Sequence, residues 1–152
     1  HGFPQKNQHT FTDAHHLRAS DMTCNSKRGN RDFVNGGRLD DECGFLKFGD
    51  GTVEAPDIVK GDTARMMFYM AVRYDGDNES NTPDLELIDR TTETRTPLFG
   101  KLCTLLEWHK KDPVSDEERK RNNVIYSWQG NRNPFIDHPE WAESIWGNKC
   151  GL

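Results

Sequence analysis

The chain has 152 residues, of which 33% are hydrophobic and 30% are charged, and its formal net charge at pH 7 is −5. This length fits a single domain with a core of its own, and the negative total excludes a chain-wide basic surplus as the basis of nucleic-acid binding. No run approaches the roughly 18 apolar residues of a membrane-spanning helix, so we expect no membrane partner.

The first forty residues are expected to hold one strand and one helix. Residues 14–18, AHHLR, read as a short strand after an irregular start. Ser20 is a suitable N-cap for a helix that runs to about Arg28 and is ended by Gly29. Four cations cluster here and could bind phosphate, although a solvated basic turn explains them equally well on charge alone: Lys27, Arg28, Arg31 and Arg38.

A loop and a hairpin should follow. Residues 30–43 are polar and rich in glycine, which indicates a loop. Asp50 and Gly51 then separate two runs that contain apolar residues, so residues 44–55 are expected to form a β-hairpin.

A buried helix is predicted next, with Asp62 as its N-cap. One face carries apolar residues at the spacing i, i+3, i+4, i+7 and i+8, namely Ala64, Met67, Phe68, Ala71 and Val72. Further apolar residues widen this stripe (Met66, Tyr69 and Met70), which favours a core helix over a cofactor site. Arg65 within it is expected to pair with a buried carboxylate, and a long polar loop should cover residues 75–96.

The remaining sequence predicts three helices. The first runs from about Leu98 to Lys110 with four leucines on one face, Leu98, Leu102, Leu105 and Leu106. Ser115 and Glu118 form a capping box for the second, which should end at Gly130 and turn three apolar residues inward, Val124, Ile125 and Trp128. Pro139 lies near the start of a short last helix. The fold class is therefore α+β, mostly helical with short strands.

Asn25 could belong to a metal-assisted phosphate site. Mg²⁺ prefers oxygen ligands and keeps most of its waters, so one or two protein oxygens suffice, and Arg28 at i+3 can face the same side as Asn25. From the residues alone a metal site is one interpretation, and an ordinary surface helix is the other. A helix asparagine is usually a surface residue, and a histidine pair such as His15 and His16 usually has one ring buried against a carbonyl and one in water.

The segment QGNRNPF, residues 129–135, also allows two interpretations. Arg132 could reach a phosphate of a bound nucleic acid. Alternatively the asparagines bond to their own backbone while Phe135 fills the core, and we favour this structural interpretation. The tryptophans could stack on bases, but core or helix-edge packing is expected for most of Trp108, Trp128, Trp141 and Trp146.

Three stretches resemble the secreted endonuclease I family. They are DAHHLRASDMTCNSKRGN (residues 13–30), KGDTARMMFYMAVRYDG (60–76) and the long segment from Gly100 to Glu140, in the family's order. The resemblance implies a ββα-metal (His-Me finger) core in one domain over residues 1–152. It also implies cleavage of DNA, and often RNA, with little sequence preference and with one Mg²⁺ ion. Asn25 matches the helix asparagine that ligates the metal, and Lys27, Arg28 and Arg132 are the candidate substrate contacts.

One part of the family pattern has no match. The family's general-base histidine and a metal-ligating glutamate lie in an Arg-Glu-His-x-Trp segment on its first strand, before the region that resembles HGFPQ, residues 1–5. The chain opens without an initiator Met or a signal peptide. We therefore expect a fragment or processed product with half of the active site, in which His15 is the remaining candidate for a base. A catalytically inactive domain that binds nucleic acid or a protein is the alternative, and a purely structural extracellular domain is a third.

The four cysteines lack C-x-x-C spacing, which argues against a zinc ribbon. An even count allows two disulfides or four free thiols. The family resemblance implies secretion to the periplasm or the exterior and hence oxidised cysteines. Of the three possible pairings we expect Cys24 with Cys43 and Cys103 with Cys150.

Overall fold

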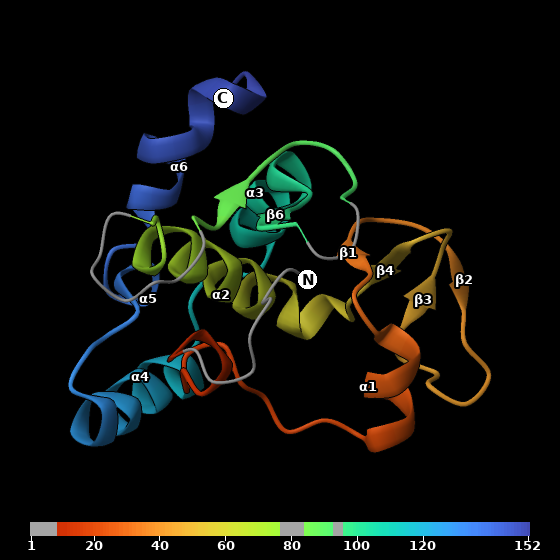
Figure 1. Ribbon diagram of the computed structural model, residues 1–152, viewed down its shortest axis with the longest axis horizontal. Helices are drawn as coiled ribbons and strands as arrows, with labels where there is room; N and C mark the ends of the chain where they lie inside the picture. Colours follow the sequence, from red (N-terminus) through yellow and green to blue (C-terminus); the bar gives the residue numbers. More distant parts are fainter. Residues whose placement is uncertain (1–8, 77–83, 93–95) are drawn as a thin grey trace.

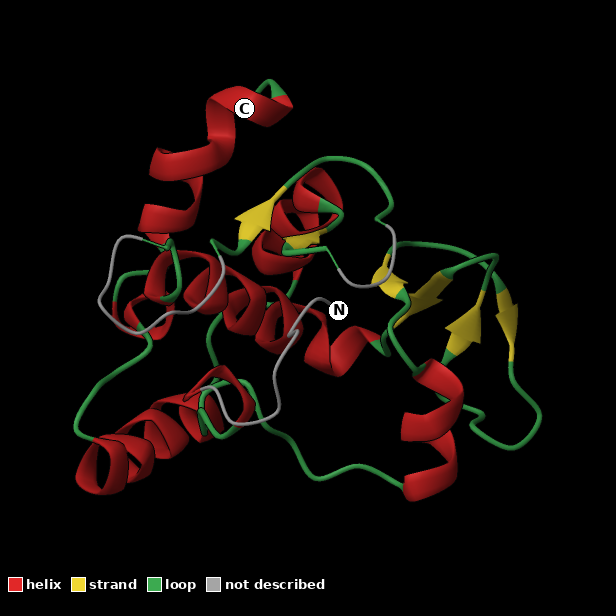
Figure 2. Cartoon of the chain, viewed as in Figure 1, coloured by secondary structure: helices red, strands yellow, loops and turns green. Residues whose placement is uncertain are grey.

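The computed structural model describes residues 9–76, 84–92 and 96–152. A central helix, α2, has α3 packed above it and α4 below it, and a small sheet lies at one end beside α1 (Figures 1 and 2). The helices are α1 Met22–Arg28, α2 Lys60–Arg73, α3 Leu102–Lys111, α4 Asp116–Gln129, α5 Pro134–Asp137 and α6 Glu140–Trp146. Short 3₁₀ turns cover His9–Phe11, Asp57–Val59 and Gly147–Cys150. The predicted α+β class is confirmed.

The strands form two small sheets. Their bounds are β1 Asp32–Phe33, β2 Arg38–Leu39, β3 Lys47–Phe48, β4 Thr52–Glu54, β5 Glu86–Leu87 and β6 Leu98–Phe99. The first sheet has the order β1-β4-β3-β2, and the predicted hairpin is its antiparallel β3–β4 pair. Two predictions are corrected here. Residues 30–43 hold β1 and β2 as well as loop, because β4 and β3 provide pairing edges for them. Within 75–96, residues 77–83 and 93–95 lie outside the described residues, and Glu86–Leu87 form a strand beside β6.

Helix α2 is the centre of the hydrophobic core, as its apolar spacing predicts. Ala64 and Phe68 are fully buried, and both lie in the cluster that α3 completes with Leu102, Leu105 and Leu106. The helix begins two residues before Asp62, and Val72 is exposed at its far end. The predicted start of the next helix at Leu98 is wrong, because Leu98 and Phe99 pair with β5 and the helix begins only at Leu102.

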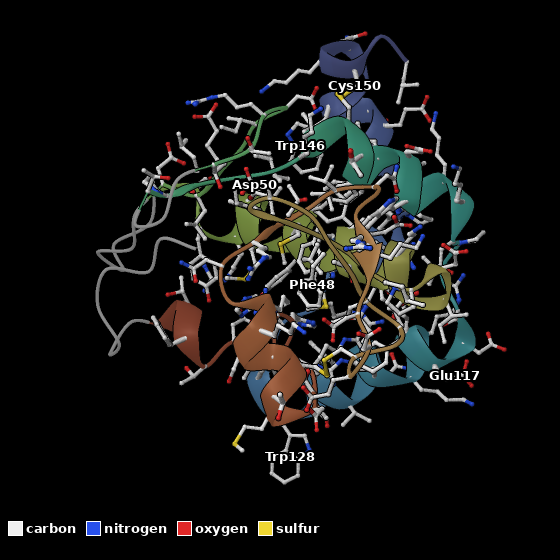
Figure 3. All side chains as sticks on the ribbon, turned by 90° about the vertical axis from the view of Figure 1, so that its right-hand side faces the viewer. Phe48, Asp50, Glu117, Trp128, Trp146 and Cys150 are labelled. Carbon is white, nitrogen blue, oxygen red and sulfur yellow. A yellow bond between two sulfur atoms is a disulfide. The ribbon has the colours of Figure 1, made fainter. Side chains whose placement is uncertain are left out.

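Helix α4 begins and ends as predicted but buries a different face. The Ser115–Glu118 capping box is present in both directions, and Gly130 ends the helix in a left-handed conformation at φ 81°. Ile125 is buried, whereas Trp128 is 88% exposed and projects from the end of the helix (Figure 3). Val124 is also exposed, so the inward assignment of these two is wrong. Polar contacts to α2 and to the loop after α4 determine the buried face, which carries Glu118 and Asn122.

The segment that leads into α1 is a turn and not a strand. Residues 14–16 form a turn in which the His16 amide donates to the Asp13 carbonyl oxygen. Asp21 rather than Ser20 caps α1, since its carboxylate accepts from the Cys24 amide. Gly29 ends the helix as expected.

Two disulfides join α1 and α3 to later parts of the chain. Cys24 is bonded to Cys43, and Cys103 is bonded to Cys150, which is the expected pairing. Through the part of the chain that the structure describes, none of the helices combines the length and the apolar character needed to cross a bilayer.

Candidate functional site

Asp13 anchors the turn that carries the two histidines. Its buried carboxylate accepts hydrogen bonds from the hydroxyls of Tyr69 at 2.6 Å and Tyr74 at 2.8 Å, and from Gln129 Nε2 at 2.9 Å. Burial by itself would raise the pKa of Asp13, but these bonds and the His15 amide hold it below its ordinary value. The same burial and the neighbouring carboxylate raise the pKa of both tyrosines. A charged Asp13 therefore ties the turn to α2 and to the end of α4.

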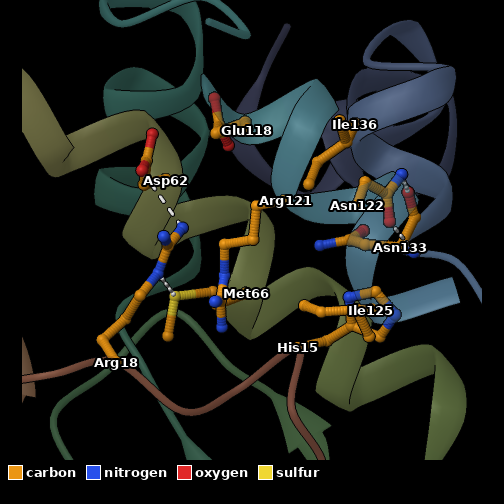
Figure 4. A pocket seen from close by; sticks show the side chains of 10 residues that line it. All are labelled: His15, Arg18, Asp62, Met66, Glu118, Arg121, Asn122, Ile125, Asn133 and Ile136. Carbon is orange, nitrogen blue, oxygen red and sulfur yellow. Dashed lines mark hydrogen bonds and ion pairs between the residues drawn. The ribbon is translucent and has the colours of Figure 1, made fainter. Parts of the chain in front are cut away.

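His15 is held inside the protein. The residue is 3% exposed, its Nε2 lies 3.0 Å from the backbone oxygen of Asn131, and its ring centroid lies 4.6 Å from that of Tyr69. Figure 4 shows it at the edge of a small recess beside Ile125 of α4. Burial lowers the pKa of His15, so the ring is neutral at pH 7 and donates its Nε2 proton to the carbonyl. These contacts favour a structural role over the assignment as general base.

Two arginines hold the rest of this segment. Arg121 Nη2 donates to the backbone oxygens of Ala14 and Leu17, each at 2.6 Å. Arg18 pairs with Asp62 at 3.1 Å (Figure 4). Residues 17–21 then extend from beside α4 to α1 (Figure 1). The contacts of Arg121 and Arg18 therefore hold the first part of the segment that leads to α1.

Asn25 lies on the exposed side of α1. The helix around it is held by the Cys24–Cys43 disulfide and by an ion pair between Lys27 and Asp40. Arg31 closes its C-terminal end by donating to the backbone oxygens of Lys27 and Arg28. The amide of Asn25 is therefore presented to solvent on a rigid short helix.

Arg28 faces inward from the same helix. Its guanidinium lies over the Phe33 ring, 5.9 Å from the centroid, and burial lowers its pKa. Among the described residues the guanidinium of Arg28 makes no hydrogen bond and no ion pair. It shares a hollow of about 270 Å³ with His16. Arg28 is thus a half-buried cation within reach of a cavity.

Arg132 lies away from α1. Its guanidinium bonds both carboxylate oxygens of Asp137 at 2.7 Å and Asn123 Oδ1 at 2.8 Å. It belongs to the loop between α4 and α5, across the molecule from α1 (Figure 1). Asn133 caps α5 and Phe135 is buried in the core, as the structural interpretation of QGNRNPF predicts. The Asn131 side chain instead bonds to Tyr69 and Gln129 and not to its own backbone. The structure brings Asn25, Lys27 and Arg28 together on one helix and leaves His15 and Arg132 elsewhere.

The side chains near α1 fit part of a magnesium site. Across the described ranges, no group of three or more His, Cys, Asp and Glu side chains is placed to hold a metal ion. Asn25 offers one exposed amide oxygen, which is a ligand type that Mg²⁺ accepts alongside water. The residues present therefore fit as one ligand, and a negatively charged second ligand would have to come from another segment.

The sequence did not predict the roles of Asp13 and Arg121, which hold the segment that leads to α1. Asp13 precedes the histidine pair directly, but its partners Tyr69, Tyr74 and Gln129 are 56 to 116 residues away. Arg121 bonds the backbone of residues more than 100 positions earlier. The sequence holds one indication of such contacts on α4. Glu118 and Asn122 are polar residues at the spacing i, i+4, which places both on the same face of the helix.

The chain is similar in sequence to known nucleases. A family model described as Endonuclease I matches residues 1–140. The extracellular ribonuclease of Bacillus subtilis (strain 168) is 56% identical over 136 residues, which cover 89% of this chain and 46% of that protein. The extracellular ribonuclease of Bacillus amyloliquefaciens is 53% identical over the same shares. The protein named endonuclease-1 of Buchnera aphidicola subsp. Baizongia pistaciae (strain Bp) is 32% identical over 91 residues, 60% of this chain and 29% of that protein. The chain spans about half the length of the two Bacillus relatives it matches.

Proposed function

Because the chain belongs to the endonuclease I family, we propose that it is part of a magnesium-dependent nuclease that hydrolyses phosphodiester bonds of RNA and DNA. The observation that carries this proposal is the placement of Asn25 and Arg28 on one rigid helix, with an exposed amide oxygen three residues from a cation that has no anionic partner among the described residues. The names of the two Bacillus relatives support RNA as a substrate.

The proposed roles follow from the chemistry of each group. Asn25 would hold a hydrated Mg²⁺ through its amide oxygen. When bound, the ion neutralises charge on the scissile phosphate and on its leaving oxygen. Arg28 would hold a non-bridging phosphate oxygen by charge-assisted hydrogen bonds. Lys27 would add positive potential at the same end of α1, although its pair with Asp40 reduces this contribution. Hydrolysis adds water to phosphorus and breaks one P–O bond, so a base must take a proton from that water.

We further propose that the base lies outside these 152 residues. The resemblance assigns it to an Arg-Glu-His-x-Trp segment that the chain does not contain. The matched relatives are about twice as long as the matched region, which leaves room for such a segment. The engagement of His15 with Asn131 supports this view, because its Nε2 is already used.

The proposed location is outside the cell. Two disulfides join all four cysteines, and disulfides persist in oxidising compartments. Both Bacillus relatives are named extracellular ribonucleases. A nuclease-like domain that binds nucleic acid without cutting it is the second candidate, and the structural environment of His15 is the observation that favours it.

A cleavage assay separates the two candidates. A longer protein that carries the upstream Glu-His segment should nick plasmid DNA and cut RNA, and EDTA should abolish both activities. Binding of the same substrates without cleavage, in the presence of Mg²⁺, would instead identify the binding domain.

A further inference from the structure

The hollow beside Arg28 has the composition of a site for an aromatic anion. It holds about 270 Å³ and lies between α1, β1, α2 and β6. Its apolar wall includes Phe33, Met67, Met70 and Phe99, and its polar groups include Arg28 and His16. Each described residue that lines it is either neutral or basic. An apolar wall with one cation and one imidazole suits a flat ring that carries a negative group.

Arg28 differs from the other buried or half-buried arginines. Arg65 is bonded to Glu118, and Arg132 is bonded to Asp137. Arg121 donates to two backbone oxygens. Arg28 has only the face of Phe33 as a partner among the described residues. A cation that has lost part of its hydration without gaining an anion gains strongly from binding one.

The apolar wall suits a nucleobase in particular. Phenylalanine rings and methionine thioethers both make favourable contacts with aromatic rings, and stacking on such side chains holds bases without sequence preference. His16 lies at the same hollow. Burial and the charge of Arg28 lower the pKa of His16, although Asp13 opposes them, so its imidazole adds no second cation there.

We propose that this hollow binds one unstacked nucleotide of a single-stranded nucleic acid, with its phosphate on Arg28 and its base against Phe33 and Met67. The inference rests on the proposed nuclease function and names its preferred substrate class. A base inside a duplex must leave its stack before it can enter a hollow, which costs free energy. Single strands present such bases without that cost.

The binding test uses calorimetry on the 152-residue chain with uridine monophosphate, uridine and inorganic phosphate. The monophosphate should bind at least about tenfold more tightly than either part alone, because the ring and the anion are held together. Arg28→Met should weaken it by about tenfold or more, and Phe33→Ala should weaken both the nucleotide and uridine. Arg38→Met removes an exposed cation of β2, which lies at the opposite edge of the sheet from β1, and should leave binding unchanged. Circular dichroism confirms that each variant is folded.

Two results would overturn the hollow as a nucleotide site. One is equal affinity for phosphate and for the monophosphate, which would mean that the apolar wall contributes nothing. The other is an equal loss of binding in Arg38→Met and Arg28→Met, which would indicate general attraction to basic side chains.

A cleavage test separates this inference from the proposed function. The longer protein with the upstream segment should cut single-stranded RNA at least about tenfold faster than a duplex of the same sequence. EDTA-sensitive cutting of both at one rate would leave the nuclease proposal intact and reject the single-strand site. Absence of all cleavage would reject the nuclease proposal, and the calorimetry would then decide on the hollow by itself.

Discussion

Arg65 of α2 and Glu118 of α4 form a bidentate ion pair inside the protein. Arg65 Nε lies 2.7 Å from Glu118 Oε1, and Nη2 lies 2.6 Å from Oε2. The Arg65 side chain is fully buried, so the expected buried carboxylate partner is confirmed as Glu118. Glu118 also bonds the Ser115 amide in the capping box. One carboxylate therefore joins the start of α4 to the central helix.

Removal of Glu118 should destabilise the fold strongly. Glu118→Ala leaves Arg65 charged and buried without its partner, and we expect the free energy of unfolding to fall by about 3–5 kcal/mol. Denaturant titration measures this change. Glu117→Ala is the matched control, since Glu117 is exposed on the same turn and its contact with Lys120 is 3.9 Å long; it should cost less than about 0.5 kcal/mol. Similar losses in both variants would show that the ion pair is not the cause.

Asp62 should make stability depend on pH. Burial and the charge of Glu118 raise the pKa of Asp62 from 3.8 to about 6. The folded protein therefore binds this proton more tightly than the unfolded chain, so the contribution of Asp62 to stability falls as pH rises through that window and is lowest above it. In Asp62→Asn the side chain cannot ionise. The stability of the variant relative to the parent should increase by on the order of 1–3 kcal/mol between about pH 4 and pH 7.

The pH measurement has its own control. Asp116→Asn replaces an exposed carboxylate at the start of α4. Its stability relative to the parent should change by less than about 0.5 kcal/mol over the same range. If the stability difference between Asp62→Asn and the parent also stays constant from about pH 4 to pH 7, the raised pKa of Asp62 is contradicted.

Asn25 should matter for cleavage and little for folding. In the longer protein, Asn25→Ala removes the proposed metal ligand, and we expect cleavage to fall by about a hundredfold or more at fixed Mg²⁺. The free energy of unfolding should change by less than about 0.5 kcal/mol because the side chain is exposed. Ser26→Ala, on the next exposed position of α1, should leave both quantities unchanged. An Asn25→Ala protein that cuts as fast as the parent would rule out the ligand assignment.

His15 should show the opposite pattern. His15→Ala removes a buried ring together with its bond to the Asn131 oxygen, so we expect a loss of about 1–3 kcal/mol in the free energy of unfolding. Cleavage by the longer protein, expressed per folded molecule, should stay within a few-fold of the parent. Lost cleavage with unchanged stability would restore His15 as the general base.

The 152-residue chain by itself should fold and cut poorly. Its core is built from α2, α3 and the region around Phe135, all within the described residues, so a cooperative thermal transition is expected. A missing base costs a factor of roughly a hundred to ten thousand in rate. Addition of a peptide with the upstream Glu-His segment should restore EDTA-sensitive cleavage. Full activity of the 152 residues without that peptide would disprove the half-site proposal.

Local sequence determined both ends of α4, the central position of α2 and the β3–β4 hairpin. The Ser115–Glu118 capping box and the left-handed Gly130 specify both ends of α4 through contacts within one turn. The apolar spacing of α2 predicted the core helix because a 3.6-residue period places those side chains on one face whatever lies opposite. The Asp50-Gly51 hairpin has the same local origin.

Tertiary structure decided which faces and which residues are used. Hydrophobicity predicts that Trp128 is buried and Glu118 is exposed, and the structure has the reverse. Arg65 on α2 requires a carboxylate partner where α4 packs against it, and Glu118 provides it. The two adjacent histidines cannot be told apart along the chain. The Asn131 carbonyl, 116 residues away, binds the ring of His15, while His16 turns toward Arg28. Contacts over such separations depend on how whole elements pack, and no local pattern in the sequence encodes them.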